Sequence, residues 1–185
     1  MGRAATLVLQ LALFSGVAVA DHCPEESIAK VEPETQLARI SFERGGFPRV
    51  AQIYGPPGTS HEVSDSGYPP GSGEANYSWQ VGLGRLEVFT MFYRDSGKRI
   101  ESVVAVRTDG VASVPGFQTG RGLRLGDTFG HATKLYGPVY LSRSVNGPDL
   151  PGETRTFCFS DGTELGVGID AKGKVTAIWL APIGE

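Results

Sequence analysis

A short apolar segment that ends in Tyr-Gly-Pro occurs twice in the chain, and this duplication constrains the possible folds more than any other feature. The first copy reaches its tyrosine at Tyr54 and the second at Tyr136, an offset of 82 residues. In both copies the apolar residues follow the spacing i, i+3, i+4, i+7, which places them on one side of a helix. The Gly and Pro that follow each tyrosine are typical helix terminators. We therefore expect two short helices in equivalent positions, near 47–54 and 129–136.

Each expected helix is followed by a long polar loop and then by three runs of alternating or continuous apolar residues. Short turns separate these runs, among them Asp161-Gly162, a dipeptide that favours a β-hairpin because both central residues of its turn need positive φ. The sequence predicts an α+β fold of two tandem repeats, each a short helix followed by an antiparallel three-stranded meander. The two meanders would align edge to edge or pack as one continuous sheet, with the helices on one face. The predicted strands are 77–81, 86–93 and 99–107 in the first repeat and 155–159, 164–169 and 175–180 in the second.

The first twenty residues are typical of an export signal peptide. Arg3 gives a positively charged N-terminal region, an apolar run then continues to Phe14, and the small residues 18–20 form the cleavage site. That run is shorter than the roughly 20 residues needed to cross a bilayer. We expect cleavage near Ala20 and a secreted or periplasmic mature chain without a membrane span.

The rest of the chain divides into four expected regions. Between residues 21 and 34 five acidic side chains accompany one lysine, and we interpret this stretch as solvated. No stretch concentrates Lys and Arg, which argues against nucleic acid or an anionic membrane surface as a partner. The expected regions are an acidic N-terminal tail over 21–37, repeat 1 over 38–110, a connector over 111–120 and repeat 2 over 121–185.

The chain contains two cysteines, Cys23 and Cys158. Two thiols in an oxidising compartment are usually joined, so we expect a disulfide that ties the tail to a C-terminal strand. It would close a loop of about 135 residues and stabilise the fold by about 4 to 5 kcal/mol on chain-entropy grounds. The alternatives are a buried free Cys158 and lipidation of Cys23, although Asp21 and His22 do not provide the small residue that a lipidation signal requires.

The sequence contains no recognisable catalytic or metal-binding motif. Zinc sites combine three or four ligands at characteristic spacings, which the three histidines, His22, His61 and His131, do not provide. Cys158 lies within a predicted strand and not at a helix N-terminus, where a thiolate is stabilised. No serine lies in a Gly-x-Ser-x-Gly elbow. We expect no catalytic residue, no metal and no cofactor.

The loops after the two helices, 55–75 and 137–153, are the candidate functional segments. They are long for connectors and occupy equivalent positions. Tyrosine is a frequent energetic anchor of protein interfaces, and each loop contains one. Plain solvated linkers are the alternative interpretation. The predicted interaction residues are His61, Tyr68, Tyr140 and Arg143.

The segment Leu125-Gly126-Asp127-Thr128, continuing to Leu135-Tyr136-Gly137-Pro138, also carries a family resemblance; its counterpart Glu43-Arg44-Gly45-Gly46 is more diverged. An apolar pair, a short helix ending in Gly-Pro and a three-stranded meander resemble the small repeat shared by the outer-membrane assembly lipoprotein BamE and the secreted β-lactamase inhibitor proteins. The BamE resemblance implies a lipid anchor, and the inhibitor resemblance implies a disulfide within each repeat. Each half of this chain has a single cysteine, and no inhibitory residue can be matched.

Export, duplication and the lack of a convergent catalytic set together predict a non-catalytic module that binds another protein. Its partner would lie in the envelope or the extracellular space, and binding would use the loops or an exposed sheet face. Two alternatives stay open: a small secreted hydrolase with a site between the repeats, and a purely structural envelope protein.

Overall fold

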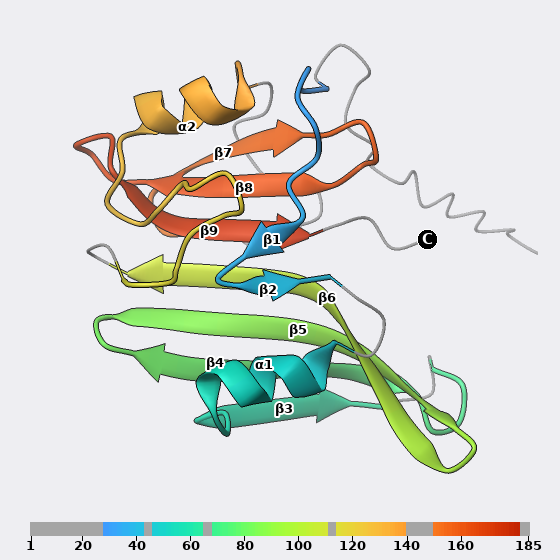
Figure 1. Ribbon diagram of the computed structural model, residues 1–185. Helices are drawn as coiled ribbons and strands as arrows, with labels where there is room; N and C mark the ends of the chain where they lie inside the picture. Colours follow the sequence, from blue (N-terminus) through green and yellow to red (C-terminus); the bar gives the residue numbers. More distant parts are fainter. Residues whose placement is uncertain (1–27, 43–45, 65–67, 111–113, 140–149, 182–185) are drawn as a thin grey trace, which may run out of the picture.

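A computed structural model of the chain describes residues 28–42, 46–64, 68–110, 114–139 and 150–181. These residues form one seven-stranded antiparallel sheet, one two-stranded sheet and two α-helices (Figure 1). The strand order in the large sheet is β3-β4-β5-β6-β9-β8-β7. In chain order the elements are β1 (Gln36–Leu37), β2 (Ile40–Ser41), α1 (Phe47–Tyr54), β3 (Thr59–Val63), β4 (Gly73–Val81), β5 (Gly84–Asp95), β6 (Lys98–Gly110), α2 (Phe129–Tyr136), β7 (Glu153–Cys158), β8 (Glu164–Ile169) and β9 (Val175–Ala181).

The fold class predicted from the sequence, α+β with two tandem helix-plus-three-strand repeats, is wrong. The structure is mostly β: each helix has eight residues, and strands β3 to β9 form one continuous sheet. The first half supplies four strands to it because β3 forms at 59–63, where the sequence predicts a loop. All five side chains of β3 are exposed, so it lacks the apolar alternation that identifies a strand. Its backbone pairing with β4 makes it an edge strand.

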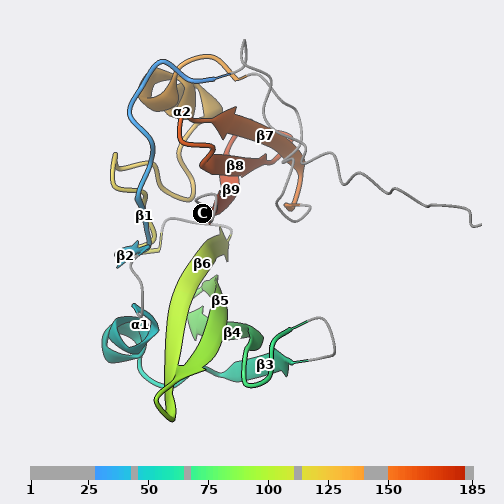
Figure 2. The ribbon, with the colours of Figure 1, turned by 90° about the vertical axis from the view of Figure 1, so that its right-hand side faces the viewer.

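The two halves of the sheet meet where β6 pairs with β9, with Val106 opposite Leu180. Figure 2 shows α1, α2 and the β1–β2 pair on the same face of the sheet, which we call the helix face. Successive side chains of a strand point to opposite faces, so every second residue of β3–β6 points away from the helices. We call this opposite side of β3–β6, which carries His61, Asn76 and Phe89, the open face.

Both helices lie where the apolar spacing predicts them, at Phe47–Tyr54 and Phe129–Tyr136. The hydroxyl of Thr128 caps α2 by accepting a hydrogen bond from a backbone N–H of its first turn. Gly55 and Gly137 end the helices with φ of 75° and 88°. Glycine is favoured there because it reaches positive φ without steric cost.

Aromatic packing fixes α1 on the helix face of β4. The ring of Phe47 stacks on that of Tyr77 with 4.2 Å between centroids, and the Tyr54 ring lies 6.2 Å from Trp79. The indole N–H of Trp79 donates to the backbone oxygen of Gly55 at 3.0 Å, at the end of the helix. These contacts hold the helix on one side of the sheet, so it leaves the other side of β3–β6 uncovered.

The stretch of the N-terminal tail from residue 28 onward is partly packed into the core. Ala29, Glu34 and Leu37 are buried, so the interpretation of the tail as solvated is wrong for these residues. Ile28 forms a parallel bridge with Cys158, and the Ala29 N–H donates to the Cys158 carbonyl oxygen at 2.7 Å. The tail therefore extends the sheet beyond β7 at this point.

Gly152, just before β7, is required by close packing as well as by its backbone conformation. Its φ is 87°, and a Cβ there would lie 2.2 Å from the backbone oxygen of Ile169. We expect Gly152→Ala to lower the free energy of unfolding by about 3 kcal/mol, because the backbone of β8 must move. Gly173→Ala is the matched control: φ is 71° but nothing lies within 4 Å of its Cβ, so we expect a loss of about 1 kcal/mol. Urea unfolding measures both, and equal losses would contradict the packing argument.

Candidate functional site

The structure describes two of the four predicted interaction residues and does not bring them into one loop. His61 lies in the middle of β3 and is exposed. Tyr68 is half-buried in the segment between β3 and β4. Tyr140 and Arg143 lie outside the described residues. The first candidate loop is therefore partly a strand, and His61 belongs to a sheet face.

The structure describes one of the two cysteines of the predicted disulfide. Cys158, the last residue of β7, is fully buried, and no cysteine is free among the residues that the structure describes. Cys23 lies outside them. The Cys23–Cys158 pairing therefore stays a prediction.

The open face carries large apolar side chains. Phe89 and Met91 of β5 lie on it, since they alternate with residues whose side chains are buried against the helices. The Phe89 ring packs edge-on against Trp179 of β9, with 5.2 Å between centroids. Met91 is 48% exposed, and Val63 of the edge strand β3, on the far side of β4, is 37% exposed. Apolar side chains on the open face thus come from β3 and β5, with polar residues of β4 between them.

Four charged residues, Arg85, Glu87, Arg107 and Asp109, form a network beside this apolar surface. Arg85 Nη2 lies 2.9 Å from Asp109 Oδ2, and Arg107 Nε lies 3.5 Å from a carboxylate oxygen of each acid. The hydrogen bond to Asp109, with the nearby charge of Glu87, raises the pKa of Arg85 above its usual value. The two cations and two anions compensate one another, so this part of the open face has no net charge.

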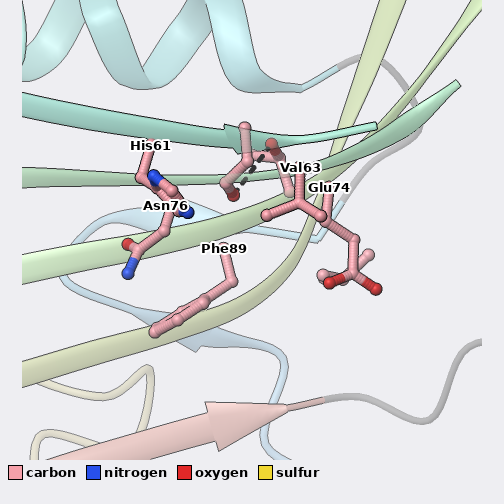
Figure 3. A pocket seen from close by; sticks show the side chains of 8 residues that line it. His61, Val63, Glu74, Asn76 and Phe89 are labelled. Carbon is pink, nitrogen blue, oxygen red and sulfur yellow. Dashed lines mark hydrogen bonds between the residues drawn. The ribbon is translucent and has the colours of Figure 1, made fainter. Parts of the chain in front are cut away.

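A cavity of about 210 Å³ opens on the same face (Figure 3). Strand register explains its shape: Asn76 lies opposite both His61 and Phe89, which makes one row of side chains across three strands. A β-bulge in the β5–β6 pairing begins at Phe89 and gives Val104 a place on the cavity wall. The lining residues are His61, Val63, Glu74, Ala75, Asn76, Phe89, Thr90 and Val104.

One polar atom of the cavity lining, the acceptor Asn76 Oδ1, is buried without a hydrogen-bond partner in the described part of the chain. The donors Arg107 Nε and Trp179 Nε1, which lie outside the lining, are also buried without such a partner. Buried polar groups are nearly always paired, and leaving one unpaired costs about 1 to 3 kcal/mol.

The chemistry available in the cavity is limited. Within the ranges that the structure describes, no group of three or more His, Cys, Asp or Glu residues is arranged to hold a metal ion. Thr90 is the one hydroxyl residue of the described lining, and its Oγ1 bonds to the Glu101 carboxylate at 2.5 Å. The hydroxyl proton of Thr90 is thus engaged by a buried carboxylate.

Comparison with known proteins adds no identification: no protein-family model, no curated protein and no solved structure matches the chain. The resemblance to BamE and to the β-lactamase inhibitor proteins therefore stays a prediction. Among the described residues, no helix has both the length and the apolar character needed to cross a membrane.

Sequence reasoning missed Glu74, Asn76 and Phe89 as site residues. The alternation over 86–93 predicts a strand, but it does not say which side of that strand the helices cover. The polar residues Glu74 and Asn76 alternate with buried Ala75 and Tyr77, and this pattern could have extended the predicted strand backwards. A strand that begins only at residue 77 leaves both polar residues in a loop.

Proposed function

We propose that the chain is an exported, non-catalytic module that binds another protein through its open face. The supporting observation is that Phe89, Met91 and Val63 share the open face, over which no described element packs, with the unpartnered acceptor Asn76 Oδ1. Antiparallel sheets do expose one face to water, but that face is then polar and its atoms are solvated. A partner lying on this face would remove its apolar surface from water.

The open face also has the anatomy of a protein interface. Aromatic residues and Met are enriched at the centre of such interfaces, while charged residues lie at the rim. Phe89 and Met91 would form the centre here. The compensated network of Arg85 and Asp109 would lie beside it, where paired charges act mainly on specificity.

The proposed location rests on residues 1–20. An exported chain would meet its partner in the periplasm, on the envelope or outside the cell, after cleavage near Ala20. N-terminal sequencing of the mature protein tests this part separately, because a retained residue 1–20 segment would contradict export by this signal.

We expect Met91→Arg to reduce the capture of the partner about tenfold or more, because it places a charge at the centre of the interface. Leu83→Arg is the matched control: Leu83 is 74% exposed, more than Met91 at 48%, but it lies in the β4–β5 turn. The mature chain is immobilised, incubated with envelope and extracellular fractions, and the bound proteins are quantified by mass spectrometry. Capture that Met91→Arg leaves intact, or that both variants reduce equally, would overturn the proposal.

A further inference from the structure

The two edges of the large sheet differ in whether another segment lies beside them. At one edge, β7 is extended by the N-terminal segment, because Ile28 bridges Cys158 and the Ala29 N–H donates to the Cys158 carbonyl oxygen. At the other edge, β3 pairs with β4, and no further strand of the described chain lies beside it (Figure 1). All five side chains of β3 are exposed as well. The outer side of β3 is therefore an accessible backbone edge.

The pairing of β3 with β4 shows which backbone groups of β3 point outward. The Gly58 N–H donates to the Ser78 carbonyl oxygen at 2.8 Å, so the backbone groups of Ser78 point toward β3. In an antiparallel pair, residues directly opposite each other alternate between hydrogen-bonded and non-hydrogen-bonded pairs. Every second residue from Thr59, which lies opposite Ser78, therefore bonds to β4. The N–H and C=O groups of Ser60 and Glu62 point away from β4, and no described residue pairs with them.

We propose that this edge pairs with β3 of a second copy of the chain, in antiparallel orientation and with Ser60 opposite Glu62 of the copy. Outward-pointing groups bond only to outward-pointing groups, so Ser60 must lie opposite either itself or Glu62. The Ser60–Glu62 register forms two hydrogen-bonded pairs about the two-fold axis, and each pair exchanges both N–H···O bonds. A register with Ser60 opposite itself forms one such pair within β3, and a register with Glu62 opposite itself also brings two carboxylates together.

The side chains are compatible with the proposed register. Glu62 points to the helix face, where it would lie beside a serine hydroxyl of the second copy. Its charge is compensated within its own copy, because Glu62 Oε1 lies 2.8 Å from Arg99 Nη1. On the open face, His61 would lie opposite itself, and Thr59 would lie opposite Val63, a pair of β-branched residues suited to neighbouring strands. Histidine is mostly neutral above about pH 7, so no like charges meet at the axis there.

Strand β3 also lacks the residues that commonly prevent edge pairing. Proteins protect exposed edges with lysine, with proline or with a covering segment. The five residues Thr59–Val63 include neither lysine nor proline. Pairing would join the two seven-stranded sheets into one. Because the two-fold axis would run perpendicular to the sheet, the open faces of both copies would lie on the same side.

Sedimentation velocity of the mature chain at about pH 7.5 measures this association. We expect a weak dimer with a Kd of about 0.1 mM, because one pair of short strands is a small interface. Ser60→Pro should raise the Kd about tenfold or more, since it removes an outward N–H from each copy but no bond to β4. Ser60→Ala is the matched control: it keeps the N–H and should change the Kd less than about twofold. His61→Lys leaves the backbone intact, places two ammonium groups opposite each other and should raise the Kd about fivefold.

Hydrogen exchange followed by NMR locates the contact. The amides of Ser60 and Glu62 should exchange more slowly as the protein concentration rises from about 0.05 to about 1 mM. The amide of His61 already bonds to β4 and should not respond to concentration.

A chain that stays monomeric at about 1 mM, or a dimer that Ser60→Pro leaves intact, would overturn the pairing. Exchange at Ser60 and Glu62 that does not depend on concentration would overturn it as well. A monomeric chain that captures another protein, and loses it through Ser60→Pro, would assign the edge to that protein and not to a second copy. The inference does not depend on the function proposed above: Met91 lies on β5, which β4 separates from the edge, so Met91→Arg should leave the Kd unchanged.

Discussion

Reduction of a Cys23–Cys158 disulfide is expected to lower the free energy of unfolding of the mature chain by about 4 kcal/mol. The structure places Ile28, which follows Cys23 by five residues in the chain, beside Cys158: Ile28 forms a bridge with Cys158, and the Ala29 N–H donates to the Cys158 carbonyl oxygen. The five residues from Cys23 to Ile28 span at most about 18 Å when extended. The crosslink would thus tether a segment that already pairs with the end of β7.

Three measurements test the pairing. Thiol titration of the denatured, unreduced protein should find no free cysteine, and urea unfolding with and without dithiothreitol should show the loss of stability. The double variant Cys23→Ser, Cys158→Ala is the control, and its stability should not respond to dithiothreitol; alanine is used at position 158 because that side chain is buried. Two free thiols in the denatured protein, or equal stability of the oxidised and reduced forms, would contradict the crosslink.

Local sequence patterns located both helices and strands β4 to β9, but not β1, β2 and β3. The apolar spacing located both eight-residue helices, and Glu164–Ile169 forms a strand with the predicted bounds. These features depend on residues a few positions apart. The fold class was wrong because it depends on non-local pairing: β6 joins β9 into one sheet, and the polar edge strand β3 exists because β4 lies beside it.

The candidate site depends on the same non-local information. Alternation along β5 shows that Phe89 and Val88 point to opposite sides, but it does not say which side is covered. The covered side is the one on which α1 packs, where Phe47 contacts Tyr77 and Tyr54 contacts Trp79. Residues on the other side form the proposed binding surface because no described element packs over them, and no short sequence pattern encodes that.

Glu34 illustrates how far sequence reasoning falls short for buried polar residues. It belongs to an acidic stretch that the sequence predicts to be solvated, yet its residue is only 3% exposed. Its hydrogen-bond partners include Gly120 and Tyr136, which lie 86 and 102 residues away in the chain. Its two oxygens accept hydrogen bonds from the backbone N–H groups of Thr35, Gln36, Gly120 and Arg121 and from the hydroxyl of Tyr136. Burial raises the pKa of Tyr136, so this hydroxyl remains protonated and can donate. One carboxylate therefore joins the N-terminal segment to the connector and to α2.

Glu34→Ala is expected to lower the free energy of unfolding by about 3 kcal/mol, because it leaves several donors in the interior without an acceptor. Glu34→Gln keeps one acceptor oxygen but directs an amide at the remaining donors, so we expect a loss of about 2 kcal/mol. Glu32→Ala is the control, since Glu32 is exposed and its side chain makes no described hydrogen bond; its effect should stay within about 0.5 kcal/mol. Urea unfolding gives the three values, and hydrogen exchange at the Gly120 and Arg121 amides should quicken in the Glu34 variants. If Glu34→Ala matched Glu32→Ala in both measurements, the buried carboxylate would not be what holds the N-terminal segment in place.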